Sequence, residues 1–456
     1  MEDIHSLIDA QKSYFRTGAT LPASFRLEAL RRLGDAIRSR EADIAAALQA
    51  DLNKSAFESY MTETGMVLDE LRFVSKHLTR WAKPSRVPTP LAQFPARSRV
   101  HKDPYGVVLI MSPWNYPFQL TIEPLIGALA AGNCAVLKPS NYAPHTARLI
   151  ADLIASCFPS EYVAVVQGGR AENAALLEQE FDYIFFTGGV QVGKLVMEKA
   201  AAHLTPVSLE LGGKSPCIID ETADIPLAAK RLAFGKFLNA GQTCVAPDYL
   251  LVQRKVKEQI VAALKESIAS FFGADPLQDH DYPRIINDKH FERLCALLAD
   301  EHILEGGGTR DGAFIAPTLI DSVTSASPCM QEEIFGPILP ILEYDDLEEA
   351  IAFVRSRPKP LALYLFTRDK AAEKRVLSTL SFGGGCVNDT IIHLATSHMG
   401  FGGVGGSGMG SYHGKKSFDT FTHEKSIVKK SLLIDLPMRY HPYTEKHFRL
   451  IKRFMK

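Results

Sequence analysis

The chain has 456 residues, more than one hydrophobic core usually organises, so at least two domains are expected. Its 51 Lys and Arg residues nearly balance its 52 Asp and Glu residues, which excludes a general attraction to nucleic acid or to an anionic membrane. The seven cysteines include no CxxC pair, the N-terminus lacks a signal-peptide pattern, and no apolar run reaches the roughly 18 residues of a membrane span. A cytoplasmic protein with no nucleic-acid partner and no stable membrane anchor is therefore expected.

The N-terminal part predicts helices followed by an extended arm. Apolar residues recur at helical spacing between residues 23 and 52, and a second helical run covers residues 58–81. Four prolines within residues 84–100 exclude a continuing helix, because proline lacks the backbone N–H and fixes φ. We expect residues 84–100 to form an extended arm that pairs with another subunit.

From residue 105 onward, short apolar runs alternate with helical segments. The runs are GVVLIM, CAVLKP, YVAVVQ, DYIFFTG, SPCIID, YLLVQR, ILPILEY, LALYLFT and GGCVND. Such alternation is typical of parallel sheets whose strands are buried on both faces. We predict an α/β protein with a nucleotide-binding type of domain in residues 1–208 and a second α/β domain in residues 209–400. Residues 401–456 are expected to begin with a glycine-rich loop without regular structure and to end in a basic helix that packs on the protein itself.

One glycine-rich turn suggests a phosphate site. The segment FFTGGVQVGK places Gly188 and Gly193 between a predicted strand and a predicted helix, where backbone N–H groups can hold a phosphate. It nearly matches the Walker loop of ATPases, but Leu195 stands where a magnesium-binding Ser or Thr is needed, which argues against an ATPase. The dinucleotide fingerprint GxGxxG is absent. On this pattern alone, an ordinary turn and a phosphate site are equally favoured.

Three further residues have chemistry worth weighing. Cys244 lies among small residues in NAGQTCVAP, where its thiol can be approached, although most such cysteines are buried and inert. Glu210 in SLELGGK, taken alone, favours a solvated strand end. Asn115 in SPWNYP is flanked by prolines and, taken alone, favours turn chemistry. The functional reading of each residue depends on all three occurring together.

Taken jointly, these segments resemble the aldehyde dehydrogenase superfamily, especially its shorter class 3 branch. The resemblance covers nearly the whole chain and is carried, in family order, by PWNYP, LKPS, FTGGVQVG, LELGGKSP, GQTC, EEIFGP, VNDT and FGGVGGSGMGSYHGKKSFDTFTH. It implies a parallel-sheet cofactor domain, an α/β catalytic domain, and a small oligomerisation element built from residues 84–100 and 417–423. It also implies a homodimer that acts on a small-molecule aldehyde.

The resemblance implies a covalent mechanism. The Cys244 thiolate attacks the aldehyde, and the Asn115 amide together with the Cys244 backbone N–H stabilises the oxyanion. The thiohemiacetal passes a hydride to the nicotinamide and becomes a thioester, which water activated by Glu210 hydrolyses. Relatives that pass the acyl group to coenzyme A or phosphate do not need this base, so Glu210 favours hydrolysis. A catalytically silent relative is disfavoured because all three residues are present.

The resemblance also implies NAD or NADP as cofactor, with no metal. The cofactor-binding residues that it implies are Lys138, Thr187, Gly188, Gly193, Glu333 and Phe335. The glycines would lie at the pyrophosphate, the lysine at the adenosine ribose, and the last two residues at the nicotinamide end. Many relatives carry an acid three residues after the lysine, where this chain has Asn141. Because an acid there would repel a 2′-phosphate, its absence leaves both NAD and NADP open.

Overall fold

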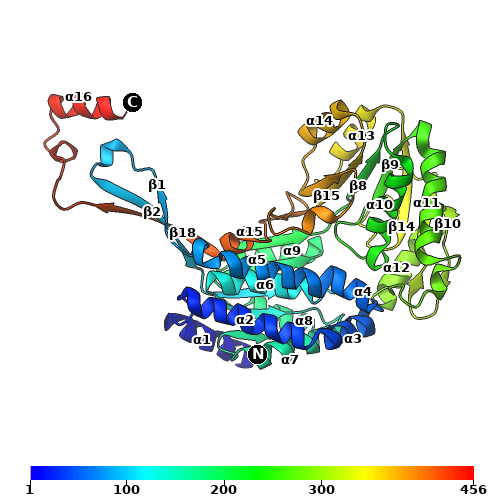
Figure 1. The fold of residues 1–456 in the computed structure, drawn as a ribbon, viewed down its shortest axis with the longest axis horizontal. Coiled ribbons are helices and arrows are strands. Elements are labelled where there is room, and N and C mark those ends of the chain that lie inside the picture. Colours follow the sequence, from blue (N-terminus) through cyan, green and yellow to red (C-terminus); the bar gives the residue numbers. More distant parts are fainter. Residues whose placement is uncertain (1, 456) are drawn as a thin grey trace.

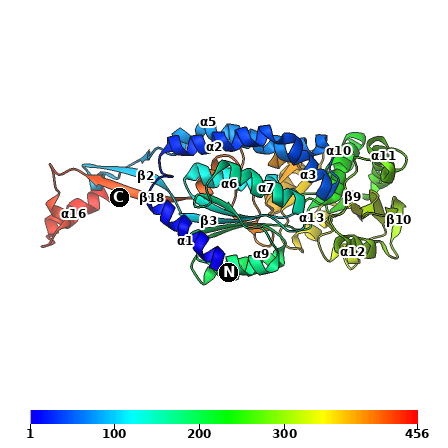
Figure 2. The same ribbon diagram turned by 90° about the horizontal axis from the view of Figure 1, so that it is seen from below.

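Two mostly parallel sheets and a projecting arm organise the chain in the computed structural model, which describes residues 2–455 (Figure 1). Helices alternate with the strands along the chain and cover the sheets (Figures 1 and 2). The expected α/β class is therefore confirmed.

The first sheet has six strands in the order β17-β7-β6-β3-β4-β5, all parallel except β17. They are β3 (Val107–Met111), β4 (Cys134–Lys138), β5 (Val163–Val165), β6 (Tyr183–Gly188), β7 (Val207–Leu211) and β17 (Gly408–Met409). Its helices are α1 (Glu2–Arg16), α6 (Gln119–Ala131), α7 (Pro144–Cys157), α8 (Arg170–Leu177) and α9 (Val190–Ala201). Because α6 and α7 cover one face while α1 and α9 cover the other (Figure 2), every residue of β3 and β4 is buried. This double cover explains why these strands are continuous apolar runs.

A further layer of N-terminal helices packs outside α6 and α7. It consists of α2 (Ala23–Ser39), α3 (Glu41–Leu52), α4 (Ala56–Ser59), the π-helix η1 (Tyr60–Thr64) and α5 (Gly65–Trp81). Leu30, Leu33 and Ile37 carry the helical spacing of α2, and all three are fully buried. The helix expected over residues 23–52 is interrupted at Arg40, and neither α1 nor the π-helix was predicted.

The second sheet has seven strands in the order β10-β13-β14-β9-β8-β15-β16, all parallel except β10. They are β8 (Pro216–Ile219), β9 (Tyr249–Gln253), β10 (His302–Glu305), β13 (Thr318–Asp321), β14 (Ile338–Tyr344), β15 (Ala362–Phe366) and β16 (Gly384–Val387). Its helices are α10 (Ile225–Phe237), α11 (Lys257–Phe272), α12 (Asp288–Leu298), α13 (Leu347–Arg355) and α14 (Lys370–Thr379). Leu250 and Val252 of β9 join the apolar core of α10 and α11, whereas Leu251 joins the core of α12 to α14. Alternate residues of one strand thus serve two helix layers.

The chain passes from the first sheet to the second between Leu211 and Pro216, so Glu210 lies in the first sheet. The glycine-rich segment after residue 400 returns to that sheet, where Gly408 of β17 pairs opposite Glu210. The expectation that this segment lacks regular structure is therefore wrong at β17. Glycine makes the approach feasible, because a Cβ at Gly408 would lie 2.1 Å from the carbonyl oxygen of Leu209. The domain boundaries at 208/209 and 400/401 stay predictions.

A three-stranded antiparallel arm projects from the body (Figure 1). It consists of β1 (Ser85–Val87), β2 (Ala96–Pro104) and β18 (Thr422–Lys430), with α15 (Lys415–Thr420) at its base and α16 (Glu445–Phe454) at its far end. The extended conformation expected for residues 84–100 is confirmed. The expected segment 417–423 covers only α15 and the start of β18, whose nine residues were not predicted as a strand.

The basic tail forms α16, which packs on the arm beside the short turn Leu91–Gln93. No helix in the described residues 2–455 has the length and apolar character of a membrane span. Short elements complete the described chain: β11 (Thr309–Arg310), β12 (Phe314–Ile315), η2 (Leu91–Gln93), η3 (Leu238–Gly241), η4 (Arg254–Val256), η5 (Pro276–Gln278), η6 (Pro328–Met330), η7 (Ile392–Leu394) and η8 (Pro437–Arg439).

Candidate active site

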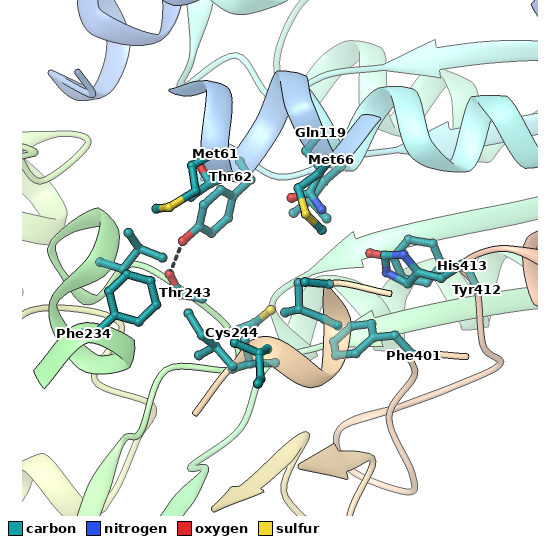
Figure 3. Close-up of a pocket in the computed structure, with 18 residues that line it drawn as sticks. Met61, Thr62, Met66, Gln119, Phe234, Thr243, Cys244, Phe401, Tyr412 and His413 are labelled. Carbon is teal, nitrogen blue, oxygen red and sulfur yellow. Dashed lines mark hydrogen bonds between the residues drawn. The ribbon is translucent and has the colours of Figure 1, made fainter. Parts of the chain in front are cut away.

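A cavity of about 230 Å³ contains the Cys244 thiol in its wall (Figure 3). Met61 and Met66 reach it from the π-helix and α5, Gln119 from α6, and Phe234 from α10. The loop after β16 and the glycine-rich segment close the remaining side. The site therefore depends on elements from both sheets and from the N-terminal helices.

Cys244 lies in a turn between η3 and β9 and is half-buried. The neighbouring Thr243 hydroxyl shares a hydrogen bond of 2.6 Å with the Tyr116 hydroxyl, which joins this turn to the loop of Asn115. Burial, followed by negative charge on Glu333 and Glu210, raises the pKa of the Cys244 thiol to about 12. Both causes disfavour the thiolate, which is the nucleophilic form of a cysteine.

Glu210 presents an unpaired carboxyl group inside the protein. Glu210 is buried on β7, and neither of its carboxyl oxygens accepts a hydrogen bond from the described residues. Burial raises the pKa of Glu210 well above its usual range. Gly402 borders it so closely that a Cβ there would lie 3.2 Å from Oε1. A raised pKa makes the deprotonated carboxylate a stronger proton acceptor.

Asn115 lies in the loop between β3 and α6 and is buried. Its side-chain Nδ2 donates to the carbonyl oxygen of Gln242 at 2.9 Å, two residues before Cys244 in the chain. An amide nitrogen has two hydrogens. The other N–H of Asn115 therefore has no partner among the described residues.

The residues expected at the pyrophosphate and the adenosine ribose gather at the carboxyl ends of β4 and β6. This edge of a parallel sheet is where ligands of such folds bind. The helix α9 begins after Gly189 without a side-chain cap, so its first backbone N–H groups are free for an anion. Gly193 lies within the first turn of α9, and a Cβ there would come 2.5 Å from Cδ2 of Leu211. Gly188 ends β6 and packs equally closely on Phe186.

Two polar side chains border the same edge. The Thr187 hydroxyl is buried on β6 without a hydrogen-bond partner among the described residues. Lys138 ends β4, and its Nζ donates to the carbonyl oxygens of Pro139 at 2.9 Å and Gly168 at 2.7 Å. Burial lowers the pKa of Lys138. An orphaned hydroxyl beside an uncapped helix fits a polar ligand at this position.

Glu333 and Phe335 approach the site from the segment before β14. The Phe335 ring meets the Trp114 ring edge-on, with ring centres 5.3 Å apart. A Cβ on Gly212 would lie 2.0 Å from Oε2 of Glu333, so the carboxyl group rests directly on that backbone. Burial is the main cause that raises the pKa of Glu333 to about 8. The structure thus brings residues 333–335 to the segments that carry Asn115 and Glu210.

The cavity also contains residues that the sequence reasoning missed. Gln119 lies four residues after Asn115 in the chain, and Tyr412 and His413 lie inside the glycine-rich C-terminal motif, so the position of each beside a recognised motif was a usable signal. Met61 had no such signal, because the inward turn of the π-helix cannot be read from spacing. Burial lowers the pKa of His413 to about 3, so this side chain contributes no charge to the cavity at neutral pH.

The comparisons agree with this geometry. The sequence profile of the aldehyde dehydrogenase family matches residues 1–427. A 4,4'-diaponeurosporen-aldehyde dehydrogenase of Staphylococcus aureus (strain NCTC 8325 / PS 47) is 53% identical over 98% of this chain and 97% of its own length. A dimeric NADP-preferring aldehyde dehydrogenase of Mus musculus is 45% identical over 95% of this chain and 96% of its own. A solved structure of Staphylococcus aureus AldH in its substrate-bound state superposes with a TM-score of 0.98 at 52% identity and covers 99% of both chains.

The expected family is confirmed by matches that span both sheets and the arm. The chain therefore belongs to the aldehyde dehydrogenase family and is an NAD(P)-dependent enzyme of that family.

Proposed function

We propose that the chain oxidises an apolar aldehyde to its carboxylic acid through a thioester on Cys244, which water activated by Glu210 hydrolyses. The observation that carries this proposal is the buried, unpaired carboxyl group of Glu210, whose charge acts on the thiol in the cavity wall. An enzyme that passed its acyl group to coenzyme A would need no such base. Burying an unpaired carboxyl group is costly, so its presence calls for a use.

In the proposed reaction, the Cys244 thiolate forms a bond to the carbonyl carbon, and the carbonyl π electrons move to oxygen. The free N–H of Asn115 and the backbone N–H of Cys244 donate to this oxyanion, and such a donor contributes about 2.7 to 4 kcal/mol to the transition state. NAD or NADP, when bound, accepts the hydride that the thiohemiacetal carbon loses. Glu210 takes a proton from water, the hydroxide adds to the thioester, and the C–S bond breaks to release the acid and the thiolate.

The residues at the strand ends fit a dinucleotide. The free N–H groups at the start of α9, with Gly188 and Gly193, would hold the pyrophosphate, and Lys138 with Thr187 would face the adenosine side. Glu333 and Phe335 would border the nicotinamide end. Asn141 is exposed and uncharged, so no acid at that position would repel a 2′-phosphate. We propose that both NAD and NADP are used, and the NADP preference in the name of the mouse relative supports this.

The cavity lining supports an apolar substrate, aromatic or medium-chain aliphatic. Its walls include Met61, Met66, Phe234, Leu394 and Phe401. No Asp, Glu, Lys or Arg side chain lies among the described residues that line it. A carboxylate carried by the substrate would lose its hydration there without gaining a partner.

The first experiment measures reduced nicotinamide absorbance with NAD or NADP and without coenzyme A. We expect hexanal and benzaldehyde to exceed succinic semialdehyde in kcat/KM by ~10²-fold or more, because an unpaired buried carboxylate costs several kcal/mol and each 1.36 kcal/mol is tenfold. Equal rates with succinic semialdehyde would contradict the apolar assignment. If reduced nicotinamide formed only with coenzyme A present, the proposed hydrolysis of the thioester would have to be replaced by transfer of the acyl group to coenzyme A.

We also propose that the chain forms a homodimer through the arm and works in the cytoplasm. β18 is an edge strand of nine residues, and Ile427 and Val428 on it are 42% and 53% exposed. An open edge with apolar side chains is a template for pairing with another chain. The word dimeric in the name of the mouse relative agrees with this arrangement. Cytoplasmic placement is supported by the seven cysteines, all of which are free thiols.

The dimer proposal predicts that charged side chains on the edge strand β18 lower the mass of the particle in solution. Light scattering after gel filtration should give about twice the chain mass of 50.2 kDa for the wild type. Ile427→Glu combined with Val428→Glu should give the mass of a single chain, because like charges would oppose each other across the interface. Leu204→Glu is the matched control, since this leucine is 91% exposed on the body rather than on the arm. A monomeric wild type would refute the proposal.

A further inference from the structure

A fully buried ion pair lies beneath the loop of Asn115. Lys54 and Glu63 are both 0% exposed, and Lys54 Nζ lies 2.6 Å from Glu63 Oε1. Desolvating two charges is expensive, so a buried pair is sustained only when further hydrogen bonds satisfy both groups. The proposed reaction uses neither residue.

The lysine has three contacts. Besides Glu63, its Nζ donates to the carbonyl oxygen of Asn115 at 3.0 Å and lies 4.0 Å from the centre of the Tyr116 ring. An ammonium group has three N–H donors, so these contacts account for its full capacity. Two of the three contacts fix the main chain and the side chain next to the oxyanion donor.

The glutamate holds the other end of the same loop. Its second oxygen, Oε2, accepts from the backbone N–H of Phe118 at 2.8 Å and of Gln119 at 3.2 Å, where α6 begins. Glu63 lies in the π-helix η1, a local widening often found at functional sites, and here the carboxylate is completely buried. The ion pair thus makes hydrogen bonds to the main chain at both ends of the segment 115–119.

The same loop is tied to the turn of Cys244. Asn239 Nδ2 donates to the carbonyl oxygen of Asn115 at 2.9 Å and to that of Gln242 at 3.2 Å. Asn115 Nδ2 donates to the same Gln242 oxygen. Asn239 and Ala240 have φ values of 52° and 49°, which non-glycine residues adopt only when surrounding contacts hold them. Lys54 and Asn239 therefore share the Asn115 carbonyl, and the hydrogen bonds of Asn239 and Asn115 extend to Gln242, two residues before Cys244.

We propose that Lys54 and Glu63 are positioning residues for the oxyanion site, which hold the Asn115 main chain so that its free amide N–H faces the carbonyl oxygen of the substrate. Neither side chain lines the described cavity, and both act through Asn115. The inference rests on the proposed function, because it presumes that Asn115 stabilises an oxyanion formed at Cys244. A displacement of about 1 Å at such a donor lowers the rate by roughly 10²-fold.

The test is a double-mutant cycle with Asn115→Ala, measured as kcat with the best aldehyde of the panel. We expect Lys54→Met to lower kcat by roughly 10²-fold with little change in KM. In the Asn115→Ala background, the same change should lower kcat by less than about threefold, because the group through which Lys54 acts is gone. If the kcat losses of Lys54→Met and Asn115→Ala multiply in full in the double variant, the proposal is refuted.

Arg26→Met is the matched control for loss of a buried cation. Arg26 is 5% exposed and donates to backbone carbonyls, including that of Ala130 at the far end of α6. Any effect of this change on kcat should multiply with that of Asn115→Ala. If Lys54→Met does not fold, the double variant Lys54→Met and Glu63→Met is used in the same cycle. It replaces the buried ion pair by apolar side chains, an exchange that proteins often tolerate.

Alkylation of Cys244 by iodoacetamide separates this proposal from the proposed function. The alkylation forms no oxyanion, so its rate should be unchanged in Lys54→Met. A large fall in that rate would show that the pair shapes the thiol turn instead, and would overturn the assignment to Asn115. If alkylation of the wild type left aldehyde oxidation intact, the thioester mechanism itself would fail, whatever the cycle shows.

Discussion

Cys244→Ala should abolish aldehyde oxidation, with a loss of at least ~10⁴-fold in kcat, while NAD and NADP still bind. Removing a catalytic nucleophile leaves only the residual contribution of binding and the oxyanion site. No other cysteine lines the described cavity, so no second thiol can take over the thioester. Gly188 ends β6 of the first sheet and Gly193 lies in α9, whereas Cys244 precedes β9 of the second sheet, so these glycines do not depend on the thiol.

The measurement combines reduced nicotinamide absorbance with nucleotide binding by calorimetry. Cys295→Ala is the matched control, since Cys295 is a free, half-buried thiol on α12 outside the cavity. It should keep wild-type activity. Turnover of the Cys244→Ala enzyme at a substantial fraction of the wild-type rate would end the thioester mechanism.

Glu210→Gln should produce one equivalent of reduced cofactor per site and then almost stop. The thioester still forms, because that step needs the thiol and the oxyanion donors, but no carboxylate remains to take the proton of water. General bases contribute about 10²- to 10⁴-fold, so the steady-state rate should fall within that range. Stopped-flow absorbance should resolve the burst, and mass spectrometry of the quenched enzyme should detect the acyl adduct on Cys244.

The pH dependence gives an independent check on Glu210. Burial raises the pKa of this carboxyl group, and only its deprotonated form can accept a proton. The steady-state rate of the wild type should therefore rise with pH through the raised pKa and fall as the carboxyl group becomes protonated. Glu210→Gln should lack this rise. Identical pH profiles in both enzymes would mean that another group is the base.

Strands of the two sheets were the part of the fold most readable from sequence. GVVLIM and CAVLKP became β3 and β4, because a strand covered on both faces must be apolar at every position. β18 escaped prediction, since most of its residues are exposed and its pairing with β2 is a contact over more than 300 residues. The π-helix escaped because its pattern differs from that of an α-helix only in hydrogen bonding.

The candidate site was likewise only partly predictable from the sequence. Cys244, Glu210 and Asn115 were named because their motifs resemble a family, whereas their spacing alone favoured a buried thiol, a strand end and a turn. Their surroundings could not be read at all. Lys54 would ordinarily be placed on a solvated helix face, and only the fold brings it under Asn115, 61 residues later in the chain.

The arm can be completed only late in the synthesis of the chain. β2 and β18 pair along their whole length, yet β18 leaves the ribosome more than 300 residues after β2. At ~5 to 20 residues per second, β2 waits roughly 15 to 60 s for its neighbour, which is ample time for the preceding domains to fold. An unfinished chain has no completed arm to offer. In the proposed homodimer, subunit pairing would therefore wait for β18, and neighbouring nascent chains on one messenger would be kept from joining too early.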